Sequence, residues 1–384
     1  MNTKEIWNPE TRVEVSSYYN NGEPIIFSPT KGFKKKNQPS AVELFSGAGG
    51  LSTGLSNAGF HVVAGVDIHK PSTKTFSHNH KNAYAINADL KFLNPDMLKD
   101  LIGNSEIDLL AAGVPCQGFS LNNRKRYARD DRNFLFREFI KYIKHLKPKA
   151  VVLENVSGMK STLKGHFIDL IKREIEACGD YKVAHTILNA ASYGVPQLRN
   201  RLFFIGVPKS TTFQWPEPTL LGTKESPFIT VREALSDLPA LPTPGERATE
   251  YENDPISAYQ KSMRKNSTKL MNHASPKHPS STVQKILNTK PGEPIYAKFT
   301  QRIRLSWDLL SPTQVAGGIR SQYQFGHPEQ GRGLTIRERA RIQSFPDHYE
   351  FHGGVVQSRI QTGNAVPPIL ASKIGEQLLK TLKT

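Results

Sequence analysis

Short apolar runs alternate with stretches of helical spacing from residue 40 to residue 207. The runs AVELF, HVVAGVD, IDLLAAG and AVVLENV have the length and composition of strands buried on both faces of a sheet. Between them, LSTGLSNAG, FLFREFIKYIKHL and GHFIDLIKREIEACG repeat apolar residues three and four positions apart, which is typical of amphipathic helices. YKVAHTILNA and RLFFIGV close the series. This alternation predicts an α/β fold with a doubly wound, mostly parallel sheet covered by helices.

The pattern changes after Val207. The residues from 208 to about 330 are rich in Pro, Ser, Thr and basic residues and show weak periodicity, so we expect a loop-rich second domain. Two helical stretches follow, over 334–345 and 369–382. The first 38 residues are polar and end in a lysine cluster. We therefore predict an N-terminal arm over 1–38, an α/β domain over 39–207 completed by 360–384, and a smaller domain over 208–359.

The charge of the chain indicates its class of partner. Lys and Arg total 51 against 34 Asp and Glu, which gives a net charge of +17 and a pI near 9.7. Such an excess attracts polyanions, with nucleic acid expected before an anionic membrane. No apolar run approaches the roughly 18 residues of a spanning helix, and the first ten residues lack the pattern of a secretory signal. We expect a cytoplasmic protein that contacts no membrane.

The two cysteines stand in different surroundings. They are too few for a disulfide framework and lack the clustering of a zinc site, so we expect a reducing compartment and no metal. Cys178, at the end of a helical stretch, fits a small buried hydrophobe. Cys116, in GVPCQGFS, is flanked by turn formers. That position favours reaction over packing.

A glycine-rich turn follows the first apolar run. It reads Ser46-Gly47-Ala48-Gly49-Gly50, and Asp67 ends the next run about 20 residues later, the offset of a carboxylate that holds ribose hydroxyls. Ser52 stands where a dinucleotide enzyme has its third glycine, so an adenosine ligand without a pyrophosphate fits better. Tight glycine turns also occur in many other α/β proteins.

Three further segments lie just beyond expected strand ends, where such sheets bind ligands. They are Pro115-Cys116, Glu154-Asn155-Val156 and the QLRNR segment with Arg199 and Arg201. Each has a plain structural explanation as a turn, a helix cap or a solvated face. Together they bring a thiol, a carboxylic acid and two guanidinium groups to one edge, which predicts a reaction site.

At this point the chain resembles the cytosine 5-specific DNA methyltransferases of bacterial restriction–modification systems. The family's signature blocks appear in order as ELFSGAGGLSTGL (43–55), GVPCQGFS (113–120), ENVSG (154–158), QLRNRLFFIG (197–206), RGLTIRERARIQSFPD (332–347) and QTGNAVPP (361–368). The resemblance covers 40–207 and 332–384. It implies a Rossmann-like methyltransferase fold, S-adenosylmethionine as methyl donor, and a target-recognition domain in the loop-rich region.

The resemblance also implies a mechanism. Cys116 would add to carbon 6 of cytosine as the nucleophile, and Glu154, protonated through burial, would supply a proton to ring nitrogen 3. Arg201 would bind the cytosine carbonyl, with Arg199 beside it. For the cofactor, Phe45 would stack on the adenine, Asp67 would hold the ribose and Asp89 would meet the adenine amino group. Gly47 and Gly49 would form the turn beneath it, and Asn364 would shape its methionine end.

A base inside a duplex must be flipped out before such an attack. The basic loop at 121–132 follows Cys116, where the family has a mobile loop that grips phosphates. The DNA contacts that we expect are Ser120, Arg124, Arg126, Arg302, Arg304 and Arg320. We also expect a monomer that shares its target with a restriction endonuclease.

Four alternatives remain open at this stage. A transfer-RNA cytosine methyltransferase has the same catalytic blocks, although the long basic region favours duplex DNA. An amino-group methyltransferase would have an acidic residue or Asn before Pro-Pro in place of Val114-Pro115-Cys116. A catalytically dead DNA-binding regulator would lack Cys116 or Glu154, and both are present. An NAD-dependent dehydrogenase fits poorly with the incomplete glycine pattern.

Overall fold

A computed structural model describes residues 22–30, 38–103, 106–115, 135–159, 166–316 and 324–383. It divides into two compact units. The α/β unit comprises the described residues up to Asn189, together with Asn200–Glu217 and the residues from Pro368 onward. The loop-rich unit comprises Ala190–Arg199 and Pro218–Pro367. Cys116, Ser120, Arg124, Arg126 and Arg320 lie outside the described residues, as does most of the expected arm.

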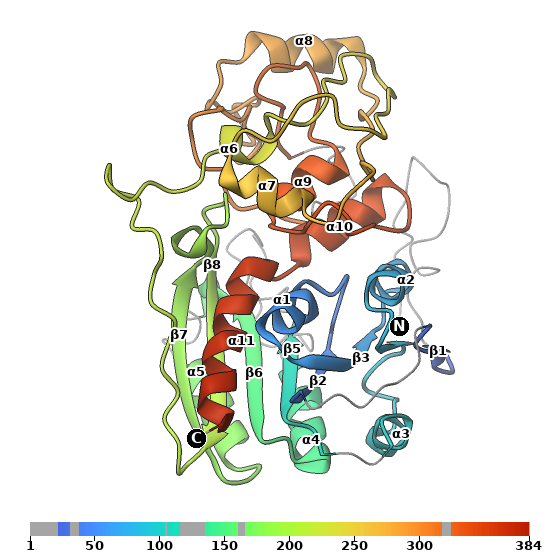
Figure 1. The fold of residues 1–384 in the computed structure, drawn as a ribbon, viewed down its shortest axis with the longest axis vertical. Helices are drawn as coiled ribbons and strands as arrows, with labels where there is room; N and C mark the ends of the chain where they lie inside the picture. The colour runs from blue at the N-terminus through green and yellow to red at the C-terminus, as the bar shows by residue number, and fades with distance from the viewer. Residues whose placement is uncertain are drawn as a thin grey trace. The chain divides into compact units, whose positions relative to one another are not determined.

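One sheet runs through the α/β unit, and its described strands follow the order β1-β4-β3-β2-β5-β6-β8-β7 (Figure 1). Strands β2 to β6 are parallel, whereas β8 is antiparallel to both neighbours and β1 is antiparallel to β4. The predicted doubly wound, mostly parallel sheet is therefore confirmed. The strands are β1 Ile25–Phe27, β2 Ser40–Leu44, β3 His61–Asp67, β4 Tyr84–Asn87, β5 Leu109–Gly113, β6 Ala150–Val156, β7 Tyr181–Asn189 and β8 Asn200–Pro208.

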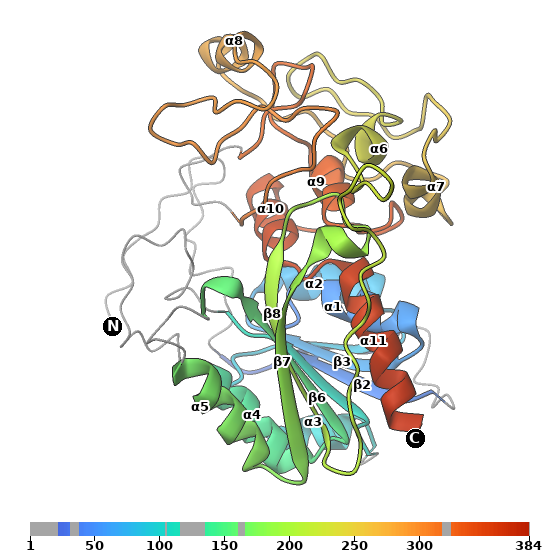
Figure 2. The same ribbon diagram turned by 90° about the vertical axis from the view of Figure 1, so that its left-hand side faces the viewer.

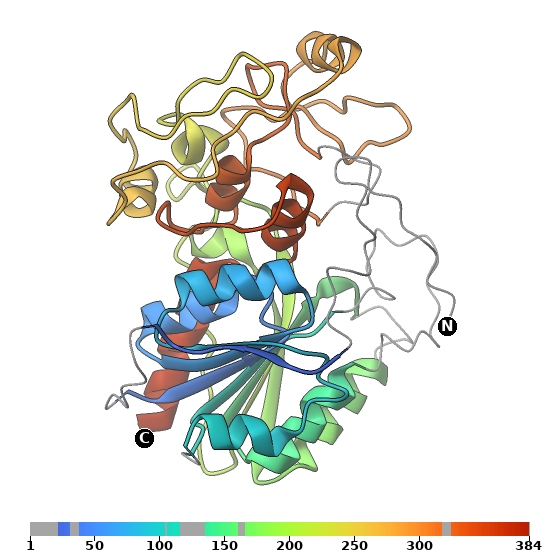
Figure 3. The same ribbon diagram turned by 90° about the vertical axis from the view of Figure 1, so that its right-hand side faces the viewer.

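Helices cover both faces of this sheet (Figures 2 and 3). One face carries α1 (Gly50–Ala58), α2 (Lys70–Asn79) and α11 (Pro368–Lys383). The opposite face carries α3 (Pro95–Leu101), α4 (Phe136–Leu146) and α5 (His166–Glu176). The apolar stripes of α3, α4 and α5 pack with the sheet into a large hydrophobic core. Each stripe follows the spacing of three and four residues that predicts a core-facing helix.

The order of the strands determines where a ligand can bind. β2 lies in the middle, with β3 and β4 on one side and β5 and β6 on the other. The loops after β2 and β5 therefore lead to opposite faces of the sheet. Open α/β sheets bind ligands beyond the carboxyl ends of the strands at such a reversal of strand order.

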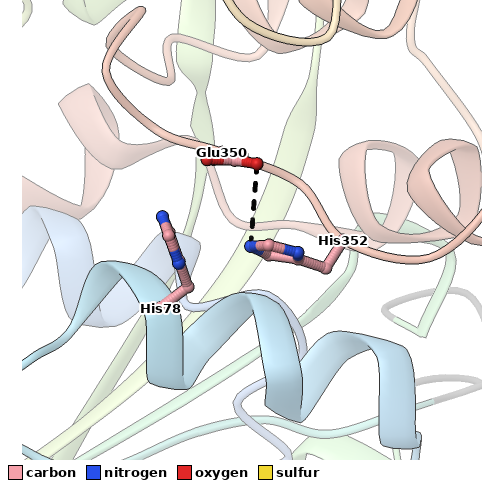
Figure 4. A group of neighbouring side chains, drawn as sticks. All are labelled: His78, Glu350 and His352. Carbon is pink, nitrogen blue, oxygen red and sulfur yellow. Dashed lines mark ion pairs between the residues drawn. The ribbon is translucent and has the colours of Figure 1, made fainter.

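The loop-rich unit contains short helices joined by long irregular segments (Figure 1). They are the 3-10 turn Ala190–Tyr193 and the helices α6 Val231–Leu235, α7 Ala258–Arg264, α8 Ser280–Asn288, α9 Ile336–Ile342 and α10 Val355–Asn364. Its interior depends on buried ion pairs. Arg341 lies 2.7 Å from Asp237 and 2.6 Å from Asp347, and all three side chains are completely buried. Near α10, the partly buried Glu350 and His352 form a longer pair of 4.0 Å (Figure 4).

The division between the units differs from the predicted boundaries. Residues 190–199 and 360–367 belong with the loop-rich unit and not with the α/β domain. Arg199 shows the physical reason, because its guanidinium donates to the carbonyls of Gln314, Gly363 and Ala365 at 2.9–3.0 Å. These bonds join both segments to the loop-rich unit. Within the described part of the chain, no helix combines the length and apolar character needed to cross a membrane.

Candidate active site

The glycine turn after β2 forms an open cradle at the start of α1. Phe45, Gly47 and Gly49 have positive φ angles of 55°, 53° and 88°. Gly49 precedes α1 without a side-chain cap, and a Cβ atom at Gly47 would meet no atom within 4 Å. Backbone N–H groups at a helix start carry partial positive charge and lack partners in the helix. The turn therefore offers a ligand space and the partial positive charge of a helix start.

Glu43, within β2, holds this turn from below. Its side chain is 3% exposed and accepts a 2.9 Å hydrogen bond from the Ser52 N–H as well as one from the Ser52 hydroxyl. Ser52 lies in the first turn of α1, so Glu43 supplies the oxygen that a capping residue would normally supply. Burial raises the pKa of Glu43 to about 8. Glu43 was not among the expected site residues, although an acid inside the apolar run AVELF was a visible signal.

Asp67 ties the end of β3 to the same turn. One carboxylate oxygen accepts from the Gly47 N–H and the other from the His69 N–H, each at 2.7 Å. Burial raises the pKa of Asp67, and the two N–H bonds oppose that shift. The Asp67 carbonyl accepts from the Ala88 N–H at 3.1 Å, which places Asp89 one residue beyond this contact.

These residues lie at the ends of three neighbouring strands. Phe45 follows β2, Asp67 ends β3 and Asp89 lies two residues beyond β4, and these strands are adjacent in the sheet. Phe45 packs against the hydrophobic core and stays partly exposed, and Asp89 is also partly exposed. An aromatic ring, two carboxylates and an open glycine turn form a donor and acceptor set that fits an adenosine-containing cofactor. The expected Asn364 is exposed at the end of α10 in the loop-rich unit.

Glu154 and Arg201 form the central charged pair of the α/β unit. Arg201 Nε lies 2.9 Å from Glu154 Oε1, and the two side chains are 12% and 9% exposed. The pairing of β6 with β8 brings them together, because Val156 lies opposite Arg201. Burial lowers the pKa of Arg201, and the charge of Glu154 counteracts this. A neighbouring guanidinium also stabilises the carboxylate form of Glu154, which modifies the expectation that burial alone keeps Glu154 protonated.

The segment that leads to Cys116 is fixed beside this pair. Gly113, the last residue of β5, lies opposite Glu154 in the parallel pairing with β6. The buried Asn155 side chain donates to the carbonyl of Val114 at 3.2 Å. Asn155 is a second residue that the sequence analysis did not assign, and it holds the chain two residues before the expected nucleophile.

Two arginines predicted to act on substrate are buried instead. Arg199 is 1% exposed and donates to carbonyl oxygens of its own unit, so its position corresponds to a structural role rather than to catalysis. Arg304 is 9% exposed and donates to carbonyls of residues 287, 289, 328 and 329. Its guanidinium is thus committed inside the loop-rich unit and not presented to DNA. Arg302, by contrast, remains partly exposed.

Comparison with protein families gives one match over most of the chain. The model of the C-5 cytosine-specific DNA methylase family matches residues 40–380. Among curated proteins, the type II methyltransferase M.DdeI of Desulfomicrobium norvegicum is 35% identical over 370 residues, covering 88% of each chain. The type II methyltransferase M1.HphI of Haemophilus parahaemolyticus is 34% identical over 351 residues, covering 88% of this chain and 86% of its own.

Solved structures agree with this match. A protein described as a DNA modification methyltransferase encoded within an E. coli prophage superposes with a TM-score of 0.74 at 26% identity, covering 90% of this chain and all of its own. DNMT2 of Spodoptera frugiperda superposes with a TM-score of 0.57 at 19% identity over 90% of this chain and all of its own. The second likeness shows a shared fold only.

Proposed function

The chain belongs to the C-5 cytosine-specific DNA methylase family, and from that premise we propose which of its side chains carry out the reaction. It is a DNA (cytosine-5)-methyltransferase related to the type II enzymes of restriction–modification systems. The observation that supports our assignment best is the buried Glu154–Arg201 pair beside the strand that leads to Cys116.

S-adenosylmethionine is the cofactor that the family implies, and when bound it supplies an electrophilic methyl group. We assign its adenosine half to the ends of β2, β3 and β4. Phe45 would lie against the adenine, Asp67 would hold the ribose, and Asp89 would meet the adenine amino group. The open turn at Gly47 and Gly49 would leave space for the cofactor. Asn364 stays an expected contact to the methionine half.

Cytosine carbon 5 is a poor nucleophile, and the proposed residues would raise its nucleophilicity. The Cys116 thiolate would add to carbon 6, which moves an electron pair toward ring nitrogen 3. Glu154 would deliver a proton or hydrogen bond there, and Arg201 would bind the neighbouring carbonyl. Carbon 5 then becomes nucleophilic enough to accept the methyl group. Loss of the carbon-5 proton to a base, expulsion of the Cys116 thiolate and return of the nitrogen-3 proton to Glu154 would restore the aromatic ring.

The Glu154–Arg201 pair indicates when, in this order of steps, Glu154 would take up its proton. Because Arg201 stabilises the Glu154 carboxylate, Glu154 takes up its proton most readily when Arg201 turns toward the base. Arg201 would therefore exchange its contact with Glu154 for one with the cytosine carbonyl as the base enters. Asn155 would keep the chain before Cys116 in place during this exchange, through its bond to Val114.

The proposed DNA contacts and cellular role are based on the similarity to type II methyltransferases. We propose that the loop at 121–132, with Ser120, Arg124 and Arg126, closes over a cytosine flipped out of duplex DNA. Arg320 is a further proposed DNA contact. The enzyme would act as a monomer in the bacterial cytoplasm and protect sites that a restriction endonuclease of the same specificity cuts.

A covalent trap tests the assignment. The wild-type enzyme is incubated with methyl-labelled S-adenosylmethionine and mixed-sequence duplex DNA that contains 5-fluorocytosine. Fluorine at carbon 5 blocks the final elimination, so the wild type should accumulate a protein–DNA adduct. Cys116→Ala should form none. Cys178→Ala is the matched control, because the pKa of Cys178 is raised by burial and its thiol donates to the Glu174 carbonyl at 3.0 Å.

The outcomes separate the possibilities. An adduct with the wild type and with Cys178→Ala, but not with Cys116→Ala, supports the nucleophile and the covalent route. Label in the DNA without any adduct would show that Cys116 has another role. No label in duplex DNA but label in transfer RNA would reassign the substrate.

A further inference from the structure

A turn over Tyr296–Arg302 in the loop-rich unit carries an arginine stacked on aromatic rings. The Arg302 guanidinium carbon lies 4.8 Å from the ring centroid of Phe299 and 5.5 Å from that of Tyr296. In the part of the chain that the structure describes, Arg302 has neither an ion pair with a carboxylate nor a hydrogen bond from its guanidinium. Its N–H donors therefore remain available to an external ligand.

The backbone holds this turn in a defined shape. The Ile295 N–H donates to the Arg302 carbonyl at 2.7 Å, and the Arg304 N–H donates to the Glu293 carbonyl at 3.0 Å. The Gly292 N–H closes the base of the turn on the Arg304 carbonyl at 2.7 Å. Residues 292–304 thus form a closed hairpin-like loop, which we call the recognition turn.

Arg304 attaches the recognition turn to the rest of its unit. Its Nη1 atom donates to the carbonyls of Leu287 and Thr289 at 2.8 and 2.9 Å, just at the end of α8. Its Nε and Nη2 atoms donate to the Pro328 carbonyl at 3.1 and 2.8 Å. The two arginines differ in exposure, since Arg304 is buried inside the unit whereas Arg302 is partly exposed.

The surroundings of the recognition turn suit a polyanion. Besides the buried Arg304, residues 285–304 carry the basic residues Lys285, Lys290, Lys298 and Arg302 and a single acidic residue, Glu293. Phe299 is 44% exposed at the tip. Lys285, on α8, lies 4.5 Å from the ring centroid of Tyr296. Positive charge next to an exposed aromatic ring provides both phosphate attraction and apolar contact with bases.

We propose that Arg302 determines target specificity by reading the edge of one base pair in the duplex, with Arg304 as the residue that positions the recognition turn. The planar guanidinium of arginine matches the O6 and N7 acceptors of guanine in the major groove. Stacking on Phe299 fixes its plane before DNA arrives, which a lysine at this position could not reproduce. This inference rests on the proposed function, because it requires duplex DNA as substrate.

The test compares substitutions within the turn. The wild-type enzyme first methylates a duplex library with randomised positions around each cytosine, and sequencing of the methylated cytosines defines its target. Arg302→Lys, Arg304→Lys and Lys298→Ala then react with the same library. Lys298, exposed on the same turn, is the control for charge alone. Thermal unfolding and the salt dependence of DNA binding are measured for each variant.

Each variant has its own expected outcome. Arg302→Lys should unfold at the wild-type temperature, lose roughly 10- to 100-fold in kcat/KM on the target, and tolerate other bases at one position. Lys298→Ala should weaken binding equally across sequences and reduce the salt slope by about one. Arg304→Lys should unfold at a lower temperature while keeping the order of preferred sequences.

Several results would overturn the inference. Arg302→Lys with the wild-type order of sequence preference would remove its role in specificity, and a clear loss of thermal stability would make it a structural residue. A wild-type enzyme that methylates no duplex in the library fails at the proposed function itself. That failure is visible before any variant is compared.

Discussion

Burial changes the ionisation of individual acidic side chains in this protein, and Glu43 is the clearest case. Glu43 lies in the central strand β2, fully enclosed, and its pKa rises to about 8 because burial penalises the carboxylate. The charges of Asp67 and Glu154 raise it further, while the two hydrogen bonds from Ser52 lower it. The residue that orders the glycine turn is therefore neutral through much of the physiological pH range.

Glu43 leads to a prediction about pH and stability. Its folded-state pKa lies above the ordinary value of 4.5, so its contribution to stability is complete below pH 4.5 and is lost as pH rises to about 8. Glu43→Gln removes this titration and keeps an oxygen for Ser52. The free energy of unfolding of the variant, minus that of the wild type, should therefore be larger at pH 8.5 than at pH 5, by no more than about 5 kcal/mol. Urea unfolding at both pH values measures the difference.

The matching control is Glu217→Gln, on an exposed residue of the same unit. Its free energy of unfolding should follow the wild type at both pH values. Parallel curves for the wild type and Glu43→Gln would mean that Glu43 is already ionised in the folded protein.

For several arginines, burial could not be predicted from the sequence. The block RERAR and the pair Arg302 and Arg304 all look like surface charge suited to DNA. Yet Arg337 and Arg341 are fully buried, and Arg304 is nearly so. Nothing in the local sequence separates them, because their acceptors come from carbonyls and carboxylates distant along the chain, such as Asp237 for Arg341. The strand-end residues Glu154 and Arg201 were predictable, because strand periodicity places them.

At the scale of elements, α1 and α11 form an unusually close pair. A Cβ atom at Gly54 would come within 2.3 Å of the Ala371 Cβ and 2.5 Å of the Pro368 carbonyl oxygen. One at Gly375 would come within 2.7 Å of the Ala58 Cβ. Glycine on each helix thus allows the two backbones to approach and supports α1, which follows the glycine turn.

Gly54→Ala should therefore destabilise the protein, against the usual trend. Alanine in place of glycine normally stabilises a helix by up to about 1 kcal/mol. Here the added methyl group overlaps neighbouring atoms, and we expect a loss of about 1–3 kcal/mol in the free energy of unfolding. Urea titration measures it. Ser56→Ala, on an exposed position of the same helix, should be neutral or slightly stabilising, and the same result for Gly54→Ala would disprove the close packing.

Hydrophobic periodicity predicted most elements of the α/β unit but few elsewhere. AVVLENV corresponds to β6 and the helical stretch at 134–146 to α4, each within two residues. The helices α6, α7 and α8 were not predicted, because the residues from 208 to about 330 show only weak periodicity. The antiparallel direction of β8 was not evident either, because strand direction depends on the connection and not on composition.

At the scale of the whole molecule, the net charge of +17 is the property most relevant to DNA. The carboxylates that are fully buried in the loop-rich unit, including Asp237 and Asp347, pair with arginine. The excess of basic over acidic residues in the whole chain attracts a polyanion. Binding through such charge releases counterions from DNA.

The affinity for duplex DNA should fall steeply with salt. If about six phosphates are contacted, log Kd should rise against log salt with a slope of about 5, which is close to a thousandfold loss between 50 and 200 mM. Fluorescence anisotropy with a labelled duplex measures this slope. Cofactor affinity over the same range, measured by calorimetry, should change far less. A slope below about 2 would mean that the positive charge lies away from the DNA.

The close packing of α1 and α11 has a consequence for folding during synthesis on the ribosome. Strands β2 to β8 are complete once residue 208 has been added, but the helix that covers α1 begins only at residue 368. In a growing chain, the face of α1 that packs on α11 therefore stays exposed while the whole loop-rich segment is synthesised. During translation, the nascent α/β unit should recruit chaperones that bind exposed apolar helices, and ribosome-bound chains arrested before residue 368 should not hold the methyl donor. The cell would thus receive the catalytic unit in working form only once the recognition turn has also been made.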